Sequence, residues 1–455
     1  MSYKLPFSEI AEVVMGQSPT KENVNTEGMG TPLLNGPTEF TARNPIPVQY
    51  TTTGKKFSKP SDILFCVRGS TTGRMNYSDQ EYAIGRGIAA IRGKGGYPTP
   101  YVRAVIEHNL DRLLVAATGS TFPNVGRDLL SNFEVEVITP EEAVLASNLI
   151  EALEDKVESN RQTNQTLEQI AQALFKSWFV DFDPVKEKIA VLEAGGTTEE
   201  AELAAMSMIA AKSSEQLAEL KQSKPDAYEQ LAQTAALFPS AMQESELGEI
   251  PEGWSTPTLK SLSDKISKGT TPRKPDLVNA SDQAIIPFIK VKDISDDSEI
   301  NRVSLEAIPA SIHEKTLKRS ILTSDDLLFS IAGTIGRVSI VDEDLNNSNT
   351  NQAVAFVRLL DKEGFLELVY LTLKSSRVQG EIASKVVQGV QANASLANIG
   401  DIKIMCPDND LLGAWKKIVH PIIKERRTLS KLIRELVALR DGVLPKLLSG
   451  ELQGK

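Results

Sequence analysis

Cysteine and histidine are scarce in this chain of 455 residues, which holds two cysteines and three histidines. Cys66 and Cys406 lie in separate apolar stretches, and neither belongs to a C-x-x-C pair, so the sequence supports neither a disulfide framework nor a zinc module. The histidines are scattered and form no i, i+4 pair that would place two metal ligands on one helix face. We expect both thiols to be buried and inert, and no bound metal.

Long apolar runs are also missing. No stretch approaches the ~18 uninterrupted apolar residues of a membrane span, and the first residues, MSYKLPFSEI, lack the basic start and apolar core of a signal peptide. With 41% hydrophobic and 24% charged residues, the composition is typical of a soluble globular protein. We therefore expect a cytoplasmic protein of about two to four domains, because one hydrophobic core rarely serves a chain of this length.

The usual catalytic signatures are absent. The sequence contains no G-x-x-x-x-G-K-[ST] phosphate loop, no G-x-G-x-x-G after a strand and no G-x-S-x-G nucleophile elbow. An Asp-Pro-Pro-Tyr quartet, whose aromatic ring would stack on a flipped base, is missing as well. We expect no catalytic residue and no cofactor site in this chain.

Negative charge dominates overall, with a formal net charge of −10, but it is unevenly distributed. The counts of basic minus acidic residues are +1 for 1–140, −6 for 141–184, −8 for 185–255, −3 for 256–410 and +6 for 411–455. Most of the acidity therefore lies between the two halves of the chain that are described next.

A long segment of the sequence occurs twice. SDILFCVRGSTTGR (61–74) is repeated as SDDLLFSIAGTIGR (324–337), and the flanking stretches match in the same order. The matching pairs are VVMGQSPTKE (13–22) with KISKGTTPRKP (265–275), TPLLNGPTEF (31–40) with IPFIKVKDIS (286–295), EYAIGRGIAAIRG (81–93) with NSNTNQAVAFVRL (347–359), and GSTFPNVGRDLLSNFEVEVITP (119–140) with GVQANASLANIGDIKIMCP (389–407). Short apolar runs between Gly, Asn and Pro predict strands, and longer helical stretches interrupt them, so each copy is expected to be an α+β domain. The G-x-x-G-R turns favour hairpins over phosphate loops.

Each copy is followed by a helix with a heptad pattern of apolar residues. The first helix begins behind TPEE, where Thr139 caps it and Pro140 is its first residue. The predicted seam residues are Ile150, Leu153, Val157, Asn160, Asn164, Leu167 and Leu174 in the first helix, and Ile422, Leu429, Leu432, Leu436 and Leu439 in the second. Ordinary amphipathic surface helices remain an alternative, but charges of −6 and +6 favour pairing of the two helices. Because the copies are tandem, the chain can bring the helices together antiparallel. Asn160 and Asn164 would then fix the register, or else mark a locally hydrated seam.

The predicted fold is two similar globular α+β domains separated by a pair of long antiparallel coiled-coil helices. The predicted segments are a first recognition domain (1–140), a first spacer helix (141–184), an acidic helical insert with linker (185–250), a second recognition domain (251–410) and a second spacer helix (411–455).

Two equivalent, loop-rich domains on a spacer suit a ligand with two separated sites, and duplex DNA is such a ligand. Polar side chains at the predicted turns are of the types that contact base edges and phosphates. The candidates are Gln17, Ser18, Lys21, Asn35, Arg68 and Arg74 in the first copy, and Thr270, Thr271, Arg273, Lys290 and Arg337 in the second. Each could instead be a solvated turn residue, and Arg74 and Arg337 could form structural ion pairs.

Four stretches carry a resemblance to a known family. They are NQTLEQIAQALFKSWFVDFDPV (164–185), LGEIPEGW (247–254), LRDGVLPKLLSGEL (439–452) and the paired G-x-x-P openings. The chain resembles the specificity subunit of type I restriction-modification enzymes over essentially its whole length. It departs from the simplest family pattern in the long insert 185–243.

The resemblance implies a non-catalytic DNA-recognition subunit in which each domain reads one half of a bipartite, asymmetric target. It also implies that two modification subunits, which methylate adenine, dock on the helices, and that restriction subunits join for cleavage. S-adenosylmethionine, ATP and Mg²⁺ are then expected in those partner subunits. Two other readings remain open from the residues alone: a coiled-coil adaptor with two protein-binding modules, and a self-sufficient modifying enzyme.

Overall fold

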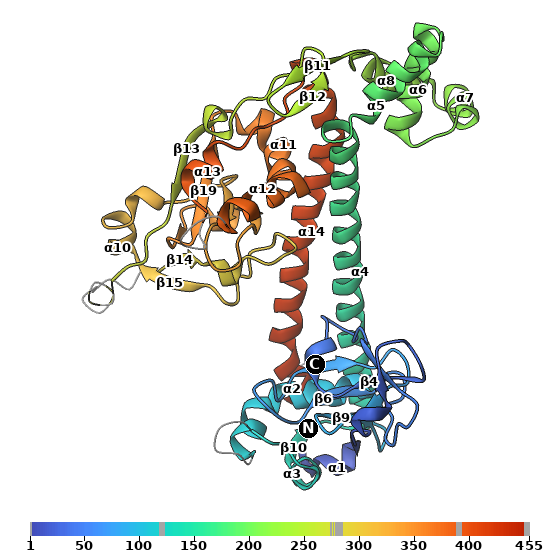
Figure 1. The fold of residues 1–455 in the computed structure, drawn as a ribbon. Coiled ribbons are helices and arrows are strands. Elements are labelled where there is room, and N and C mark those ends of the chain that lie inside the picture. Colours follow the sequence, from blue (N-terminus) through green and yellow to red (C-terminus); the bar gives the residue numbers. More distant parts are fainter. Residues whose placement is uncertain are drawn as a thin grey trace, which may run out of the picture. The chain divides into compact units, whose positions relative to one another are not determined.

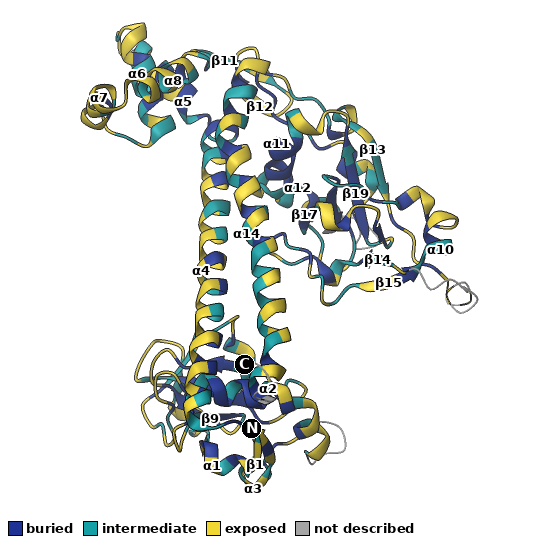
Figure 2. Cartoon of the chain, turned by 180° about the vertical axis from the view of Figure 1, so that it is seen from behind, coloured by how far each residue is buried: buried dark blue, intermediate teal, exposed yellow. Residues whose placement is uncertain are grey.

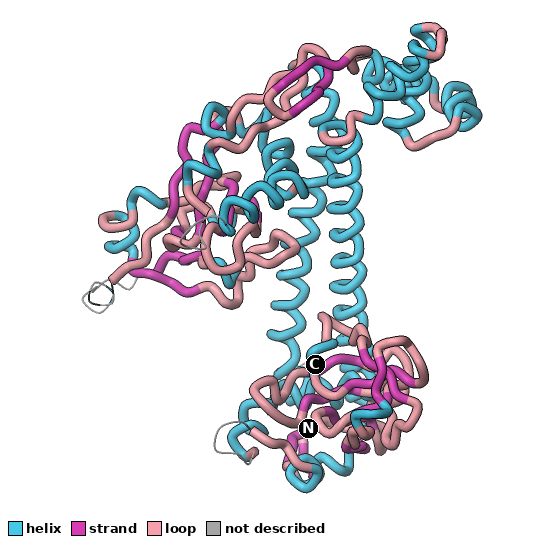
Figure 3. The backbone as a smooth tube through the Cα atoms, viewed as in Figure 1, coloured by secondary structure: helices cyan, strands magenta, loops and turns pink. Residues whose placement is uncertain are grey.

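The chain divides into two compact units. The computed structural model describes residues 2–117, 123–273, 275, 277, 285–387 and 394–449. Unit 1 comprises residues 1–162 with 431–455, and unit 2 comprises residues 163–430. Two long helices contribute to both units, α4 (Pro140–Phe179) and α14 (Asn409–Ser449). Figure 3 shows that each unit also contains strands, as the predicted α+β class requires.

Unit 1 is built on two four-stranded sheets. Their strand orders are β2-β9-β6-β7 and β3-β5-β4-β8, and a small third sheet pairs β1 with β10. The strands are β1 (Tyr3–Pro6), β2 (Ala11–Met15), β3 (Val24–Asn25), β4 (Thr31–Leu34), β5 (Gln49–Thr51), β6 (Ile63–Cys66), β7 (Met75–Tyr77), β8 (Ala83–Ile84), β9 (Ile88–Gly93) and β10 (Glu134–Val137). The helices besides α4 are α1 (Phe7–Ile10), α2 (Thr99–Ala116) and α3 (Arg127–Asn132).

The continuous apolar run of β6 reflects a strand that is buried on both faces. Phe65 belongs to the core that this sheet shares with α2, whereas Leu64 belongs to the core that it shares with the second sheet. Successive side chains of a strand point to opposite faces, so one run of apolar residues serves both cores. The neighbouring strand β9 is buried in the same way, as Figure 2 shows.

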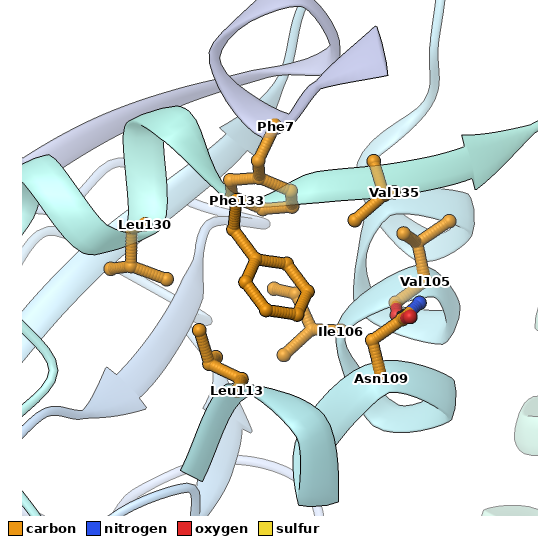
Figure 4. Close-up of a pocket in the computed structure, with 8 residues that line it drawn as sticks. All are labelled: Phe7, Val105, Ile106, Asn109, Leu113, Leu130, Phe133 and Val135. Carbon is orange, nitrogen blue, oxygen red and sulfur yellow. Dashed lines mark hydrogen bonds between the residues drawn. The ribbon is translucent and has the colours of Figure 1, made fainter. Parts of the chain in front are cut away.

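A small apolar hollow lies in the core of unit 1 (Figure 4). It is lined by residues of α1, α2, α3 and β10, namely Phe7, Val105, Ile106, Asn109, Leu113, Leu130, Phe133 and Val135. The amide of Asn109 donates to the carbonyl of Val105 within α2, so the polar group is satisfied there. With room for about one water molecule, the hollow is a packing gap and not a ligand site.

Unit 2 repeats this plan. Its sheets have the orders β13-β19-β16-β17 and β15-β14-β18, which correspond to β2-β9-β6-β7 and β5-β4-β8. The strands are β13 (Ser263–Lys268), β14 (Ile285–Ile289), β15 (Glu306–Pro309), β16 (Leu327–Ser330), β17 (Val338–Ile340), β18 (Asn349–Thr350) and β19 (Val354–Leu359). The helices are α10 (Ala310–Glu314), α11 (Lys362–Lys374), α12 (Ser376–Val387) and α13 (Leu396–Gly400). The prediction of two similar domains is confirmed, although residues 119–122 and 389–393 of the last matching pair lie outside the described part.

The acidic insert folds as a small helical module of unit 2. It consists of α5 (Asp183–Glu193), α6 (Thr198–Ala210), α7 (Ser214–Ser223) and α8 (Pro225–Ala236), followed by the hairpin β11 (Met242–Ser245) and β12 (Gly248–Pro251). Capping boxes begin α6 at Thr197 and α7 at Ser213. The buried Lys188 of α5 donates a 2.6 Å hydrogen bond to the carbonyl of Phe238, just beyond α8. Burial lowers the pKa of the Lys188 ammonium group.

In each unit a stretch of α4 lies beside a stretch of α14 and runs antiparallel to it (Figure 1). In unit 1, Glu154 faces Arg440 and Ile150 shares a core with Leu444. In unit 2, the pairs that meet are Asn164 with Ser430, Glu168 with Arg426 and Trp178 with Trp415. The residues of α4 that come later in the sequence therefore contact earlier residues of α14, which is the antiparallel arrangement expected from the tandem copies. The Asn164 amide donates a 2.7 Å hydrogen bond to the Ser430 hydroxyl, a direct polar contact between the two helices.

The buried side of α14 differs from the predicted seam. Leu439 is 52% exposed, and the predicted positions Ile422, Leu429, Leu432 and Leu436 are only partly buried. Two buried residues, Ile423 and Ser430, lie one position beyond the predicted Ile422 and Leu429. The other buried residues in the described part of α14 are Leu411, Leu412, Trp415, Val419, Arg426, Leu444 and Leu448. The prediction followed the leucines, whereas the helix buries polar side chains that have partners on α4. On α4, Ile150, Val157 and Asn160 are buried, while Leu153, Leu167 and Leu174 are partly buried.

The motif LFKSWFVDF forms an aromatic cluster in unit 2. Trp178 and Phe179 pack against Trp415 of α14, with ring centroids 5.5 and 4.8 Å away. Trp254, the last residue of GEIPEGW, packs against Phe179 and Phe182. Two of the stretches that carry the resemblance thus contribute to one hydrophobic core of unit 2, at the end of α4. No helix in the described part of the chain is long and apolar enough to cross a membrane.

Candidate nucleic-acid interface

In unit 1, the segment after β2 crosses the end of β8 at very short range. The backbone N–H of Gly16 donates a 2.9 Å hydrogen bond to the carbonyl of Ile88, and that of Gln17 donates a 2.8 Å hydrogen bond to the carbonyl of Ile84. A Cβ atom at Gly16 would lie 2.2 Å from the carbonyl oxygen of Gly85, so only glycine fits this crossing. The first predicted residues, Gln17 and Ser18, are thereby held beside the loop that follows β8.

Polar side chains from three segments meet at this crossing, which we call junction 1 (Gln17, Ser18, Asn35 and Arg86). The Ser18 hydroxyl donates a 3.2 Å hydrogen bond to the side-chain oxygen of Asn35 and accepts a 3.1 Å hydrogen bond from the backbone N–H of Arg86. Asn35 follows β4, which pairs in parallel with β8, and its amide donates 3.1 Å to Gln49 of β5. Gln17, Asn35 and Arg86 are exposed, so their functional groups face solvent from fixed backbone positions.

Unit 2 contains the same crossing, junction 2 (Thr270, Thr271, Lys290 and Gln352). The backbone N–H of Gly269 donates a 3.3 Å hydrogen bond to the carbonyl of Val354, and that of Thr270 donates a 3.2 Å hydrogen bond to the carbonyl of Thr350. A Cβ atom at Gly269 would lie 1.9 Å from the carbonyl oxygen of Thr350. Lys290 directly follows β14, which pairs in parallel with β18, and Asn35 directly follows β4, which pairs in parallel with β8. The two residues therefore hold equivalent positions.

Arg86 and Gln352 hold the same place in the two junctions, and neither is among the residues predicted from the sequence. Each lies two residues beyond the short parallel strand, β8 or β18, and each is exposed. Ser18 binds the backbone of Arg86, and Thr271, the equivalent of Ser18, donates to the side chain of Gln352. The signal was present in the repeat, because matching EYAIGRG with NSNTNQA puts Arg86 opposite Gln352.

The G-x-x-G-R turns are hairpin turns. β6 pairs with β7 and β16 pairs with β17, both antiparallel. Arg68 and Arg74 flank the first turn and are exposed, and neither forms an ion pair with a described residue. Lys21 is exposed as well, in a short 3-10 turn after junction 1. These side chains are placed where they can reach a ligand.

Two predicted residues of unit 2 are engaged within the protein. Arg337 lies 2.8 Å from Asp296 and also donates to the carbonyl of Ile294, so it forms the structural ion pair that was the alternative interpretation. Lys290 lies 2.5 Å from Glu306. Arg273 is exposed, and Lys274 lies outside the described residues. The second copy therefore offers fewer unpaired cations among its predicted residues than the first.

A partly buried ion pair joins the residue before β6 to β9 in unit 1, and the residue before β16 to β19 in unit 2. Asp62 lies 2.7 Å from Arg92, and its counterpart Asp326 lies 2.6 Å from Arg358. Each aspartate also accepts a backbone N–H three residues before it, from Lys59 or Thr323. Asp62 and Asp326, each of which directly precedes the central apolar strand of its copy, therefore have a structural role in the fold.

The cysteines fit the expected structural role. Cys66 and Cys406 are both buried, and burial raises the pKa of Cys406 to about 12, far from a reactive thiolate. Among the described residues, no group of three or more His, Cys, Asp or Glu is placed to hold a metal ion.

Comparison with known proteins places these features in a family. The sequence pattern of the type I restriction modification DNA specificity domain matches residues 4–169 and 251–424. The chain is 32% identical over 418 residues to the type I restriction enzyme HindI specificity subunit of Haemophilus influenzae, covering 88% of each protein. It is 24% identical to the type I restriction enzyme MjaIX specificity subunit of Methanocaldococcus jannaschii, covering 87% of this chain and 78% of that protein.

A solved structure shares the fold. The crystal structure of the type I restriction-modification system S subunit from M. genitalium is similar, with a TM-score of 0.55 at 14% identity. The similarity covers 98% of this chain and 96% of that one.

Proposed function

Because this chain belongs to the type I restriction modification DNA specificity family, we propose that its two α+β domains each bind one half of a bipartite, asymmetric DNA sequence. The observation that carries the proposal is the occurrence of the same junction in both units, with different side chains exposed on it. A fixed backbone with variable polar side chains is what reading two different short sequences requires.

The exposed cations of the loops suit phosphate contacts. Lys21, Arg68 and Arg74 of unit 1 and Arg273 of unit 2 carry charges without ion partners among the described residues. Phosphate contacts position a protein on the duplex, and base contacts specify the sequence. Lys290 and Arg337 would contact DNA only if their ion pairs with Glu306 and Asp296 were exchanged for phosphate.

We assign the gap between the two half-sites to α4 and α14. Both helices are continuous, of 40 and 41 residues, and a helix of fixed length acts as a ruler at about 1.5 Å per residue. The exposed faces of this pair are the proposed docking surface for two modification subunits, with restriction subunits completing the complex. In this assignment the chain contributes recognition without catalysis. Adenine methylation with S-adenosylmethionine, and cleavage with ATP and Mg²⁺, belong to the partner subunits in the cytoplasm.

Mapping of methylated adenines tests the proposal. DNA of the source organism is sequenced for methylation with the chain present and with its gene deleted. The expected result is one bipartite, asymmetric sequence that is methylated only when the chain is present. A methylation pattern that does not change on deletion would contradict the proposal.

Salt dependence of binding separates the DNA reader from a protein adaptor. A reader that contacts phosphates releases counterions, so its affinity for the mapped duplex falls steeply as salt rises. The chain is measured in complex with its modification subunits, because its own net charge is −10. An affinity that is independent of salt would favour the adaptor.

A further inference from the structure

The two junctions present different base-reading groups at one equivalent position. Arg86 of junction 1 and Gln352 of junction 2 are the exposed residues two positions after β8 and β18. Their backbones are fixed by the glycine crossings at Gly16 and Gly269, whose Cβ positions are blocked by carbonyl oxygens at 2.2 and 1.9 Å. Different side chains on the same fixed backbone can give each unit its own base preference.

The guanidinium group of Arg86 is available to contact a ligand. Its backbone N–H is held by Ser18 at 3.1 Å, and its side chain has no ion pair or hydrogen bond with a described residue. A Cβ atom at either flanking glycine would collide with Asn35, at 2.1 Å for Gly85 and 2.3 Å for Gly87. The loop therefore brings Arg86 close to Asn35, and a guanidinium fork matches the O6 and N7 acceptors of guanine.

Gln352 is oriented by a neighbour in the same junction. Thr271 donates its hydroxyl proton to the Gln352 side-chain oxygen. That oxygen keeps a second lone pair, and both amide protons stay available. One acceptor and one donor side by side match the N6 donor and N7 acceptor of adenine.

We propose that Arg86 reads a guanine in one half of the target and that Gln352 reads an adenine at the equivalent place in the other half. The proposal rests on the proposed function, because it assigns base contacts within a DNA-reading subunit. It names one position per half-site and leaves the remaining positions to the other loop residues.

Exchanging the two side chains tests the assignment. The full chain is co-expressed with its modification subunit in a host without adenine methylation, and the methylated sequences are mapped. We expect Arg86→Gln to change one required guanine to adenine in one half, and Gln352→Arg to change one required adenine to guanine in the other half. Arg86→Ala and Gln352→Ala should each relax a single position by about ten- to hundred-fold in base preference.

Each variant contains its own control, since the half read by the other unit must stay unchanged. Arg127→Ala, at an exposed arginine of α3, should leave both halves unchanged. If Arg86→Ala weakened methylation of every sequence equally, Arg86 would be a phosphate contact and the assignment would be wrong. If the wild-type chain directed methylation to no bipartite sequence, the proposed function itself would fail, which separates the two failures.

Discussion

Arg426 of α14 lies 3.1 Å from Glu168 of α4, with 6% of its side chain exposed. Lys374 of α11 lies 2.5 Å from the same carboxylate, and Arg426 also donates to the hydroxyl of Tyr370. Three helices of unit 2 are thus joined through one partly buried carboxylate. Charged residues inside a helix pair are tolerated when each finds partners, and their geometry then fixes how the helices meet.

Removing the arginine should strongly destabilise unit 2. Arg426→Ala leaves Glu168 and Glu299 partly buried without their guanidinium partner, a change that typically costs about 3–5 kcal/mol. The measurement is the free energy of unfolding from urea titration of the full chain. The control is Lys362→Ala, which removes a half-exposed partner of Asp325 and should cost less than about 1 kcal/mol. Equal effects of the two substitutions would show that the buried network contributes little.

Acid should weaken the same network. Burial works against ionisation of Glu168, but Arg426 and Lys374 outweigh it and lower the pKa of this carboxyl. A carboxyl with a lowered pKa in the folded state stabilises the protein above its unfolded-state pKa of about 4.3. That contribution is lost as the pH falls through the lower, folded-state value.

The pH test compares Glu168→Gln with the wild-type chain. Thermal unfolding from about pH 7 to about pH 3 should show a smaller loss of stability below about pH 4.5 in the variant. Glu363→Gln, at an exposed position of α11, should keep the wild-type pH dependence. If Glu168→Gln also kept it, the ionised form of Glu168 would not be the stabilising one.

The glycine crossing can be tested at a single position. Gly16→Ala would place a Cβ atom 2.2 Å from the carbonyl oxygen of Gly85, so the loop that carries Arg86 must move. We expect loss of methylation at the target, or relaxed sequence requirements confined to one half. Gly36→Ala is the matched control, because its Cβ meets nothing within 4 Å and its φ of −166° is ordinary extended backbone. If the two variants behaved identically, the glycine crossing would not be what positions the loop that carries Arg86.

Lengthening both long helices tests the ruler. Seven residues added after Gln162 in α4 and before Lys431 in α14 keep the heptad register and add about 10 Å to each helix. The gap in the methylated sequence should grow by about three base pairs, with both half-sites unchanged. Seven residues added between Gly195 and Gly196, in the loop after α5, should leave the gap as it was. An unchanged gap in the first variant would assign the spacing to something other than the helices.

Much of the architecture could be predicted because it is local and repeated. The apolar runs ILFC and LLFS are strands in both units, Thr139 caps α4 through a reciprocal contact with Glu142, and the glycine openings form the same crossing twice. Local rules of this kind depend on residues that are neighbours in sequence. A duplication supports such predictions, because the same local pattern occurs in both copies.

The rest depends on partners that are distant in sequence. The sequence does not assign Arg426 and Ser430 to the predicted seam of α14, but both are buried, with Glu168, Glu299 and Asn164 as their partners. At two predicted seam positions of α14, Ile422 and Leu429, the buried residue is the next one along, Ile423 or Ser430. Arg337 is a predicted DNA contact because of its place in the repeat, and the sequence could not decide for the structural ion pair because Asp296 lies 41 residues earlier. Burial of a charge can be predicted only when its counter-charge can be placed.

The central claim is that each unit reads its own half of one DNA target. The most direct test replaces residues 1–140 with the equivalent segment of a relative that directs methylation to another sequence, and then maps methylated adenines. The account predicts that one half of the target changes while the other half and the gap remain. A change in both halves, or in neither, would contradict it.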